Sequence, residues 1–196
     1  MRNIWVLEVF PVICYIVRHG KDDETVRGGW SGHSLVPEGI AQVKALGAEM
    51  VGKGIEVGRI YSSDIQRAKE TALILKEYLH CQVEYLPEFR EANNGDLAGL
   101  KHEVANEKFP GIYWSALDYS ECYPGGESPE QFFSRVQAAW AAFKEKMAQE
   151  SNGDVVLVTH GGVAEAILCI ENAVEFTNKV KHFATPSAKL IPIVIE

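Results

Sequence analysis

An apolar run that ends abruptly in Arg-His-Gly constrains this chain more than any other stretch. Residues 12–20 read V-I-C-Y-I-V-R-H-G, and such a run is typical of a strand buried on both faces of a parallel sheet. The carboxyl ends of parallel strands line the ligand crevice of an open α/β sheet, so we expect Arg18 and His19 in that crevice. The fixed positive charge of Arg18 favours a neutral His19 imidazole, which is a nucleophile at physiological pH. The pair therefore indicates an anionic substrate, although the tripeptide alone is also compatible with chance.

Strands and helices are predicted to alternate along the rest of the chain. The later strands are predicted at residues 60–61, 82–85, 154–159 and 188–195. Helices are predicted to begin at Pro37, after Ser62-Ser63 as a cap, at the Ser128–Gln131 capping box and after Gly162. This alternation predicts the fold class α/β, as a three-layer α/β/α sandwich with a mainly parallel central sheet. Because composition does not shift along the 196 residues, we expect a single domain over 1–196 with a lid-like region at about 100–127.

The composition limits the compartment and the partners. The net charge is −8, which opposes nonspecific attachment to nucleic acid and to anionic lipid, so an anion site must be a local positive pocket. The four cysteines are scattered without CxxC spacing, which predicts reduced thiols in a cytoplasmic protein. The apolar stretch 4–17 is too short to span a membrane, and Glu8 and Pro11 interrupt it as a signal peptide. We expect residues 1–10 to form an added edge segment or an overlong start.

Four cationic or imidazole side chains follow predicted strand ends on one side of the sheet, namely Arg18, His19, Arg67 and His160. Arginine forks match phosphate oxygens in bidentate fashion, and a second histidine can donate to the same anion. Phosphoryl transfer requires little beyond such positioning, charge stabilisation and a nucleophile. Glu91, in the irregular loop 86–100, is a candidate proton donor for the leaving oxygen. The two glycines after His160 predict a close approach of the backbone.

Five ordered motifs carry a resemblance to a known family. They are V-R-H-G at 17–20, S-S-D-I-Q-R-A-K-E-T-A at 62–72, E-A-N-N-G-D-L-A-G-L at 91–100, P-G-G-E-S at 124–128 and V-T-H-G-G at 158–162. In this order the chain resembles the histidine phosphatase superfamily, also called the phosphoglycerate mutase-like family, and its small phosphatase branch. The resemblance implies the fold of that family and a metal-independent phosphomonoesterase that forms a phosphohistidine on His19. It also implies a phosphate pocket of Arg18, Arg67 and His160, in which His160 is catalytic, and Glu91 as acid and base.

One part of the family pattern is absent. Family members usually carry Glu-Thr after Arg-His-Gly and, a few residues later, an asparagine that helps to bind the transferred group. Here residues 21–27 read K-D-D-E-T-V-R, so that asparagine is missing. Thr25 and Arg27 are the candidate substitutes for phosphate binding, and the sequence leaves the choice between them open. Glu127 is likewise left between two roles, support of the capping box and contact with a pocket histidine.

The segment 109–127 bears on the choice of substrate. It contains no lysine or arginine and offers Tyr113, Trp114, Tyr119 and Tyr123 as an aromatic wall. Such a wall favours an apolar or ring-shaped leaving group, unless the rings only pack the segment's own core. A phosphoglycerate mutase must grip a carboxylate and a second phosphate, so the missing cations favour hydrolysis of a small-molecule phosphate monoester. A broad-specificity phosphatase is the preferred interpretation, with α-ribazole phosphate as one substrate to consider.

The same residues allow several alternatives. A metal site at His19 and His160 is disfavoured because Arg18 and Arg67 would repel a divalent cation, so neither a metal nor a cofactor is expected. Cysteine phosphatase chemistry is excluded because no cysteine is followed six positions on by arginine. A mutase-type phosphotransferase and a noncatalytic phosphate-binding or scaffold protein stay open. Nucleic acid and membrane are not expected as partners, and a homodimer stays open.

Overall fold

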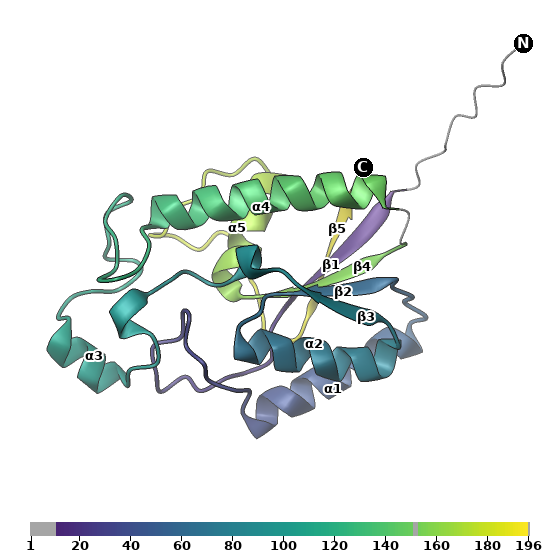
Figure 1. The fold of residues 1–196 in the computed structure, drawn as a ribbon, viewed down its shortest axis with the longest axis horizontal. Coiled ribbons are helices and arrows are strands. Elements are labelled where there is room, and N and C mark those ends of the chain that lie inside the picture. The colour runs from purple at the N-terminus through teal and green to yellow at the C-terminus, as the bar shows by residue number, and fades with distance from the viewer. Residues whose placement is uncertain (1–10, 151–152, 196) are drawn as a thin grey trace, which may run out of the picture.

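The centre of the fold is a twisted sheet with one antiparallel edge. The computed structural model describes residues 11–150 and 153–195, so the edge segment expected at residues 1–10 lies outside the described residues. Within them the sheet has five strands (Figure 1). Across the sheet these are β3 (Gln82–Tyr85), β2 (Arg59–Ser62), β4 (Val155–Thr159), β1 (Val12–Arg18) and β5 (Leu190–Ile195). Neighbouring strands are parallel except for β1 with β5, so the predicted mainly parallel sheet is confirmed.

Helices cover both faces of this sheet, which completes the predicted α/β/α sandwich. On one face lie α1 (Pro37–Gly52) and α2 (Gln66–Leu79), and on the other α4 (Pro129–Gln149) and α5 (Gly161–Glu171) (Figure 1). The short α3 (His102–Lys108) lies away from the sheet, and two 3₁₀ turns, Pro87–Phe89 and Gly95–Leu97, precede it. Among the described residues, no helix combines the length and the apolar character that crossing a bilayer requires.

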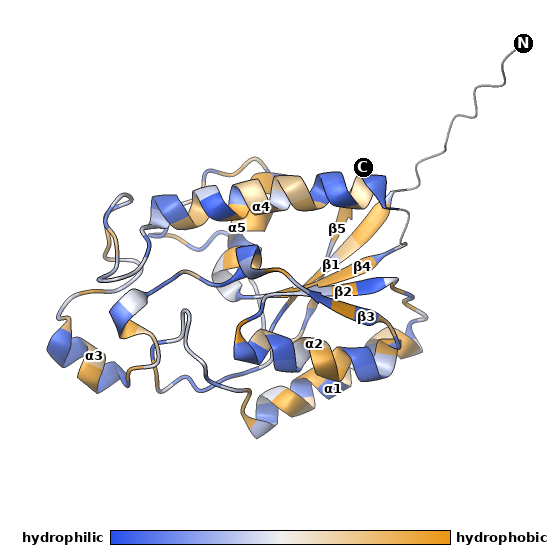
Figure 2. Cartoon of the chain, in the orientation of Figure 1, coloured by the Kyte–Doolittle hydropathy of each residue, from blue (hydrophilic) through white to orange (hydrophobic). Residues whose placement is uncertain are grey.

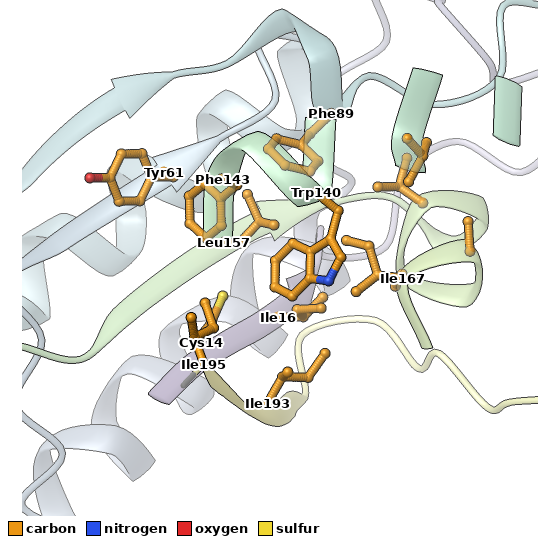
Figure 3. Close-up of a cluster of buried hydrophobic side chains, with 14 of the residues drawn as sticks. Cys14, Ile16, Tyr61, Phe89, Trp140, Phe143, Leu157, Ile167, Ile193 and Ile195 are labelled. Atoms are coloured by element: carbon orange, nitrogen blue, oxygen red, sulfur yellow. The ribbon is translucent and has the colours of Figure 1, made fainter. Parts of the chain in front are cut away.

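The central strands are buried on both faces, as their unbroken apolar runs predict. On β1, Ile16 packs in the cluster under α4 and α5, whereas Val17 packs in the cluster over α1 and α2. Figure 3 shows the first cluster, in which Trp140 and Phe143 of α4 pack on the sheet, and Figure 2 shows the apolar character of β1 and β4. Every residue of β4 is buried. Close packing of this kind leaves the central strands little freedom, so whatever follows their carboxyl ends is held firmly.

The register of the strands brings their ends to one edge of the sheet. Arg18 at the end of β1 is paired with Thr159 at the end of β4. The pairing continues one step further, because the His19 N–H donates to the Thr159 carbonyl at 2.9 Å. His19 and His160 therefore leave the sheet as neighbours. Ser62 ends β2 in the next row, paired with the residue before Thr159.

The helix starts follow the sequence prediction in one case and depart from it in another. At α4 the Ser128 hydroxyl accepts from the Gln131 N–H at 3.1 Å and the Gln131 side chain accepts from the Ser128 N–H, so the capping box is confirmed. The prediction that Ser62-Ser63 cap α2 is wrong, since α2 begins without a side-chain cap. The Ser63 hydroxyl lies instead 2.8 Å from the His160 ring. The same hydroxyl accepts from the N–H of Ile65, the residue just before α2, at 3.3 Å, so Ser63 braces the start of the chain segment without capping the helix itself.

The 100–127 segment has a small core of its own. Its buried centre is formed by Leu117 and Tyr123 together with Leu97 from the preceding 3₁₀ turn, and Phe109, Ile112 and Trp114 pack against it. The Asn178 side chain donates to the carbonyls of Trp114 and Leu117, at 2.7 and 2.9 Å. These bonds fasten the segment to the loop that follows α5.

Candidate active site

His19 is buried at the end of β1 and is held in one orientation. Only 4% of the residue is exposed. Its Nδ1 lies 2.7 Å from the Gly20 carbonyl, which fixes the proton on Nδ1 and leaves a lone pair on Nε2. Arg67 Nε donates to that Nε2 at 3.0 Å. Burial lowers the pKa of His19 well below its usual value, and the charge of Arg67 lowers it further, so the imidazole is neutral at physiological pH.

Arg67 lies in the first turn of α2 and reaches into the same place. It is 2% exposed, and its Nη2 donates to the Gly29 carbonyl at 2.9 Å while Nη1 lies 3.4 Å from the Ser31 hydroxyl. Its Nε lies 3.3 Å from a carboxylate oxygen of Asp22. The sequence analysis did not single out Asp22, because an acidic side chain is unexpected beside an anion site.

His160 stands opposite His19, with the ring centres 5.2 Å apart. The residue is fully buried, and burial followed by the charge of Arg67 lowers its pKa well below the usual value. With Nε2 engaged by the Ser63 hydroxyl, the buried Nδ1 has no hydrogen-bond partner in the described part of the chain. The same holds for the buried Nε of Arg18, whose Nη1 donates to the Thr185 carbonyl at 3.2 Å. The Arg18 Nε–H is thus a buried donor without an acceptor among the described residues, which is costly in proteins. A phosphate oxygen would accept from it, and also from His160 with the ring proton on Nδ1.

Glu91 joins this cluster through the backbone of α5. Its Oε2 accepts from the Gly162 N–H at 3.0 Å, and its Oε1 accepts from the Ala92 N–H at 3.0 Å. A Cβ at position 162 would lie 2.5 Å from Oε1, so only glycine allows this contact. The close backbone approach predicted from the two glycines is therefore present. It anchors the Glu91 carboxyl to the N–H of Gly162, the second residue after His160 in the sequence.

The two candidates for the missing asparagine go to different places. Thr25 is exposed, and its hydroxyl donates to Asp23 at 2.7 Å. It does not line the pocket beside Glu91. Arg27 does line that pocket, but none of its hydrogen bonds or ring contacts involves the two histidines. The structure therefore brings neither side chain into direct contact with the histidine pair.

A pocket of about 490 Å³ adjoins the cluster and is the natural space for a leaving group. It is lined by Glu91, Gly162, Asn94, Arg27, Gly28, Gly29, Ala92, His102, Ser115 and the rings of Tyr113, Trp114 and Tyr123. The prediction for Tyr119 is wrong, because this ring lines a separate groove with Phe133. Trp114 and Tyr123 are stacked, with centres 6.2 Å apart, and both also pack in the segment's own core. Trp114 and Tyr123 therefore belong both to the aromatic wall of the pocket and to the core of the segment.

Asn94 and Glu127 act on the loops around the pocket. The Asn94 side chain accepts from the Trp30 N–H at 3.3 Å, which ties the loop after His19 to the Glu91 loop. Glu127 accepts from the Asn93 N–H at 2.7 Å and pairs with Arg135 at 2.6 Å. It therefore supports the Glu91 loop, and none of the hydrogen bonds found for it in the described part of the chain reaches a pocket histidine. Over residues 11–150 and 153–195, no group of three or more His, Cys, Asp or Glu side chains is placed to hold a metal ion.

The fold and the site define a class: an α/β protein with a buried histidine pair and two arginines at the carboxyl edge of its sheet. A family model described as the histidine phosphatase superfamily (branch 1) matches residues 14–191. The chain therefore belongs to the histidine phosphatase superfamily.

Individual relatives point the same way. The chain is 36% identical over 160 residues to a protein of Arabidopsis thaliana named metal-independent phosphoserine phosphatase, covering 78% of this chain and 65% of that protein. It is 30% identical over 166 residues to a broad-specificity phosphatase of Saccharomyces cerevisiae, covering 79% and 67%. Among solved structures, the alpha-ribazole phosphatase from Shigella flexneri matches with a TM-score of 0.73 at 20% identity, covering 84% and 81%. The last match supports the fold alone, and the first two support phosphatase activity.

Proposed function

We propose that this chain is a metal-independent phosphomonoesterase that transfers the phosphoryl group of a small-molecule ester to His19 and then to water. The observation that carries the proposal is the convergence of His19, His160, Arg18 and Arg67, in which the buried Arg18 Nε and His160 Nδ1 have no hydrogen-bond partner in the described residues. The oxygens of a phosphate group would supply partners for these atoms. Family membership and the phosphatases among the relatives support the same activity.

His19 is the nucleophile of this reaction. In the protein without substrate, the Nε2 lone pair accepts from Arg67. A phosphate oxygen that takes over the Arg67 donors frees the lone pair to attack phosphorus. The N–P bond forms while the ester P–O bond breaks, and Arg18, Arg67 and His160 stabilise the charge on the transferred oxygens.

Glu91 completes both halves of the reaction. It gives its proton to the leaving oxygen in the first half, and in the second half it accepts a proton from the water that attacks the phosphohistidine. The products are the alcohol and inorganic phosphate, and His19 returns to its neutral form. The N–H groups of Ala92 and Gly162 hold the Glu91 carboxyl at the pocket, where the leaving oxygen would lie.

Hydrolysis is favoured over mutase chemistry by the charges around the pocket. Arg27 is the one arginine or lysine that lines it in the described residues, and a mutase substrate brings both a carboxylate and a second phosphate. The names of the relatives make phosphorylated amino acids and other small phosphate esters the first substrates to test.

The test is phosphate release from 4-nitrophenyl phosphate, with and without a chelator. We expect turnover that survives the chelator and is abolished by His19→Ala, whereas the exposed control His182→Ala retains it. Turnover by His19→Ala, or loss of wild-type turnover in chelator, would refute the mechanism. Saturable binding without turnover would favour a binding protein, and rapid interconversion of 2- and 3-phosphoglycerate with little free phosphate would favour a mutase.

A further inference from the structure

Arg27 is the pocket residue that the proposed chemistry leaves without a role. Its guanidinium carbon lies 4.2 Å from the centre of the Tyr113 ring, and its Nη2 donates to Asn106 at 2.8 Å. Its backbone is paired in both directions, since its N–H donates to the Leu100 carbonyl and its carbonyl accepts from the Gly99 N–H, each at 2.8 Å. Backbone and side chain together hold the guanidinium against the aromatic wall.

The charge of Arg27 is not balanced by a carboxylate within residues 11–150 and 153–195. No carboxylate in the described part of the chain forms an ion pair with it, whereas Arg67, Arg90 and Arg135 each have one. Its Nε is moreover buried without an acceptor. A guanidinium presents donors in a planar fork that matches a carboxylate. An arginine that is fixed in a pocket and lacks a counter-charge is a site for an anionic group of the ligand.

The position of Arg27 separates it from the phosphoryl group that is transferred. That group has Arg18, Arg67 and both histidines around it, and the contacts of Arg27 are instead with Tyr113 and Asn106 of the 100–127 segment. Arg27 and Glu91 line the same pocket. A molecule whose ester oxygen lies at Glu91 therefore extends its leaving group along the wall on which Arg27 lies.

We propose that Arg27 binds a carboxylate on the leaving group, so that the preferred substrates are phosphate monoesters of small hydroxy acids or hydroxy amino acids. This proposal rests on the proposed function and adds the class of substrate to it. A carboxylate suits the site because one guanidinium balances one negative charge. The other basic side chain of the lining, His102, has its Nε2 3.0 Å from the Glu24 carbonyl and is already engaged.

The test compares kcat/KM for pairs of substrates in which one ester has the carboxylate and the other has a hydrogen or a hydroxymethyl group in its place. O-Phosphoserine against O-phosphoethanolamine is one matched pair, and 3-phosphoglycerate against glycerol 3-phosphate is a second. For the wild-type protein we expect a preference of about tenfold or more for the carboxylate in each pair. Arg27→Gln should bring that ratio close to one, and Arg27→Lys should leave an intermediate ratio because the charge stays and the fork is lost. The control Arg59→Gln changes an arginine that pairs with Glu84 on the sheet and should leave the ratio unchanged.

The outcomes separate this proposal from the proposed function. No preference in the wild-type protein, or a preference that Arg27→Gln leaves intact, overturns the role of Arg27 while the phosphatase stands. Absence of turnover with these esters and with 4-nitrophenyl phosphate overturns the phosphatase itself. A stronger preference for sugar bisphosphates over both carboxylate esters assigns the guanidinium to a second phosphate and overturns the proposed substrate class.

Discussion

Replacing Glu91 by glutamine separates its proton from its hydrogen bonds. Both carboxylate oxygens accept backbone N–H groups, from Ala92 and from Gly162. A glutamine can accept only one of them and turns its NH₂ toward the other, which weakens the hold on this side chain by about 1 kcal/mol. That change is the same for every substrate, so it cannot by itself distinguish one ester from another.

The lost proton, by contrast, affects only esters whose leaving oxygen needs it. General acid catalysis contributes roughly 10²–10⁴-fold, and 4-nitrophenolate leaves without that help whereas an alkoxide does not. We therefore expect Glu91→Gln to lower kcat/KM for 2-glycerophosphate at least about 100-fold more than for 4-nitrophenyl phosphate. The exposed neighbour Glu88→Gln is the matched control and should alter neither substrate, with a thermal melt to show that both variants fold. Equal losses on the two esters would refute the reasoning and leave Glu91 as an acceptor that only holds Gly162.

Two further predictions concern charge in the same cluster. Asp22→Asn removes the carboxylate 3.3 Å from Arg67, so inorganic phosphate and vanadate should inhibit about tenfold more tightly, given the size of one like-charge interaction near a protein surface; unchanged inhibition constants would contradict this. Burial and the arginines keep His19 and His160 neutral in the folded chain, whereas the unfolded chain protonates them below a pKa of about 6.5. Unfolding then takes up protons in acid, and urea denaturation should show a stability loss of about 1.4 kcal/mol per histidine between pH 7.5 and about 5.5; equal stability at both pH values would disprove it.

The sheet and the histidine pair were predictable because they rest on short-range patterns. The unbroken apolar runs before Arg18 and His160 identify strands that are buried on both faces, and parallel strands necessarily bring their carboxyl ends to one edge. Helix α4 was predictable for the same reason, because its apolar stripe from Phe132 to Met147 and its Ser128 capping box are both patterns of residues close in the sequence. These elements are confirmed almost to the residue.

The side-chain contacts in the site that were not predicted join residues far apart in the sequence. Nothing local distinguishes the hydroxyl of Ser63 from a helix cap, and its bond to His160 spans 97 positions. Arg27 was predicted as a candidate phosphate-binding residue, but its place against Tyr113 was not predicted, because the wall was inferred from residues 109–127 alone. The contact of Asp22 with Arg67 was also not predicted, because α2 brings Arg67 beside Asp22 only when this helix packs on the sheet.

The small core of the 100–127 segment has a consequence for how this protein can be remodelled. The groups around the histidines follow β1 and β4 and the helices after those strands. Trp114 and Tyr123 instead belong to a patch that packs around Leu97 and Leu117, and Trp114 also contacts Phe132 of α4. Its ties to the rest include the Asn178 bonds and the pairing of residues 99–100 with Arg27. Protein engineering could replace that patch by another segment while keeping those two attachments. Such a replacement would change the substrate specificity and leave the catalytic residues unchanged. The reverse exchange, new chemistry behind the same wall, would require rebuilding the centre of the sheet.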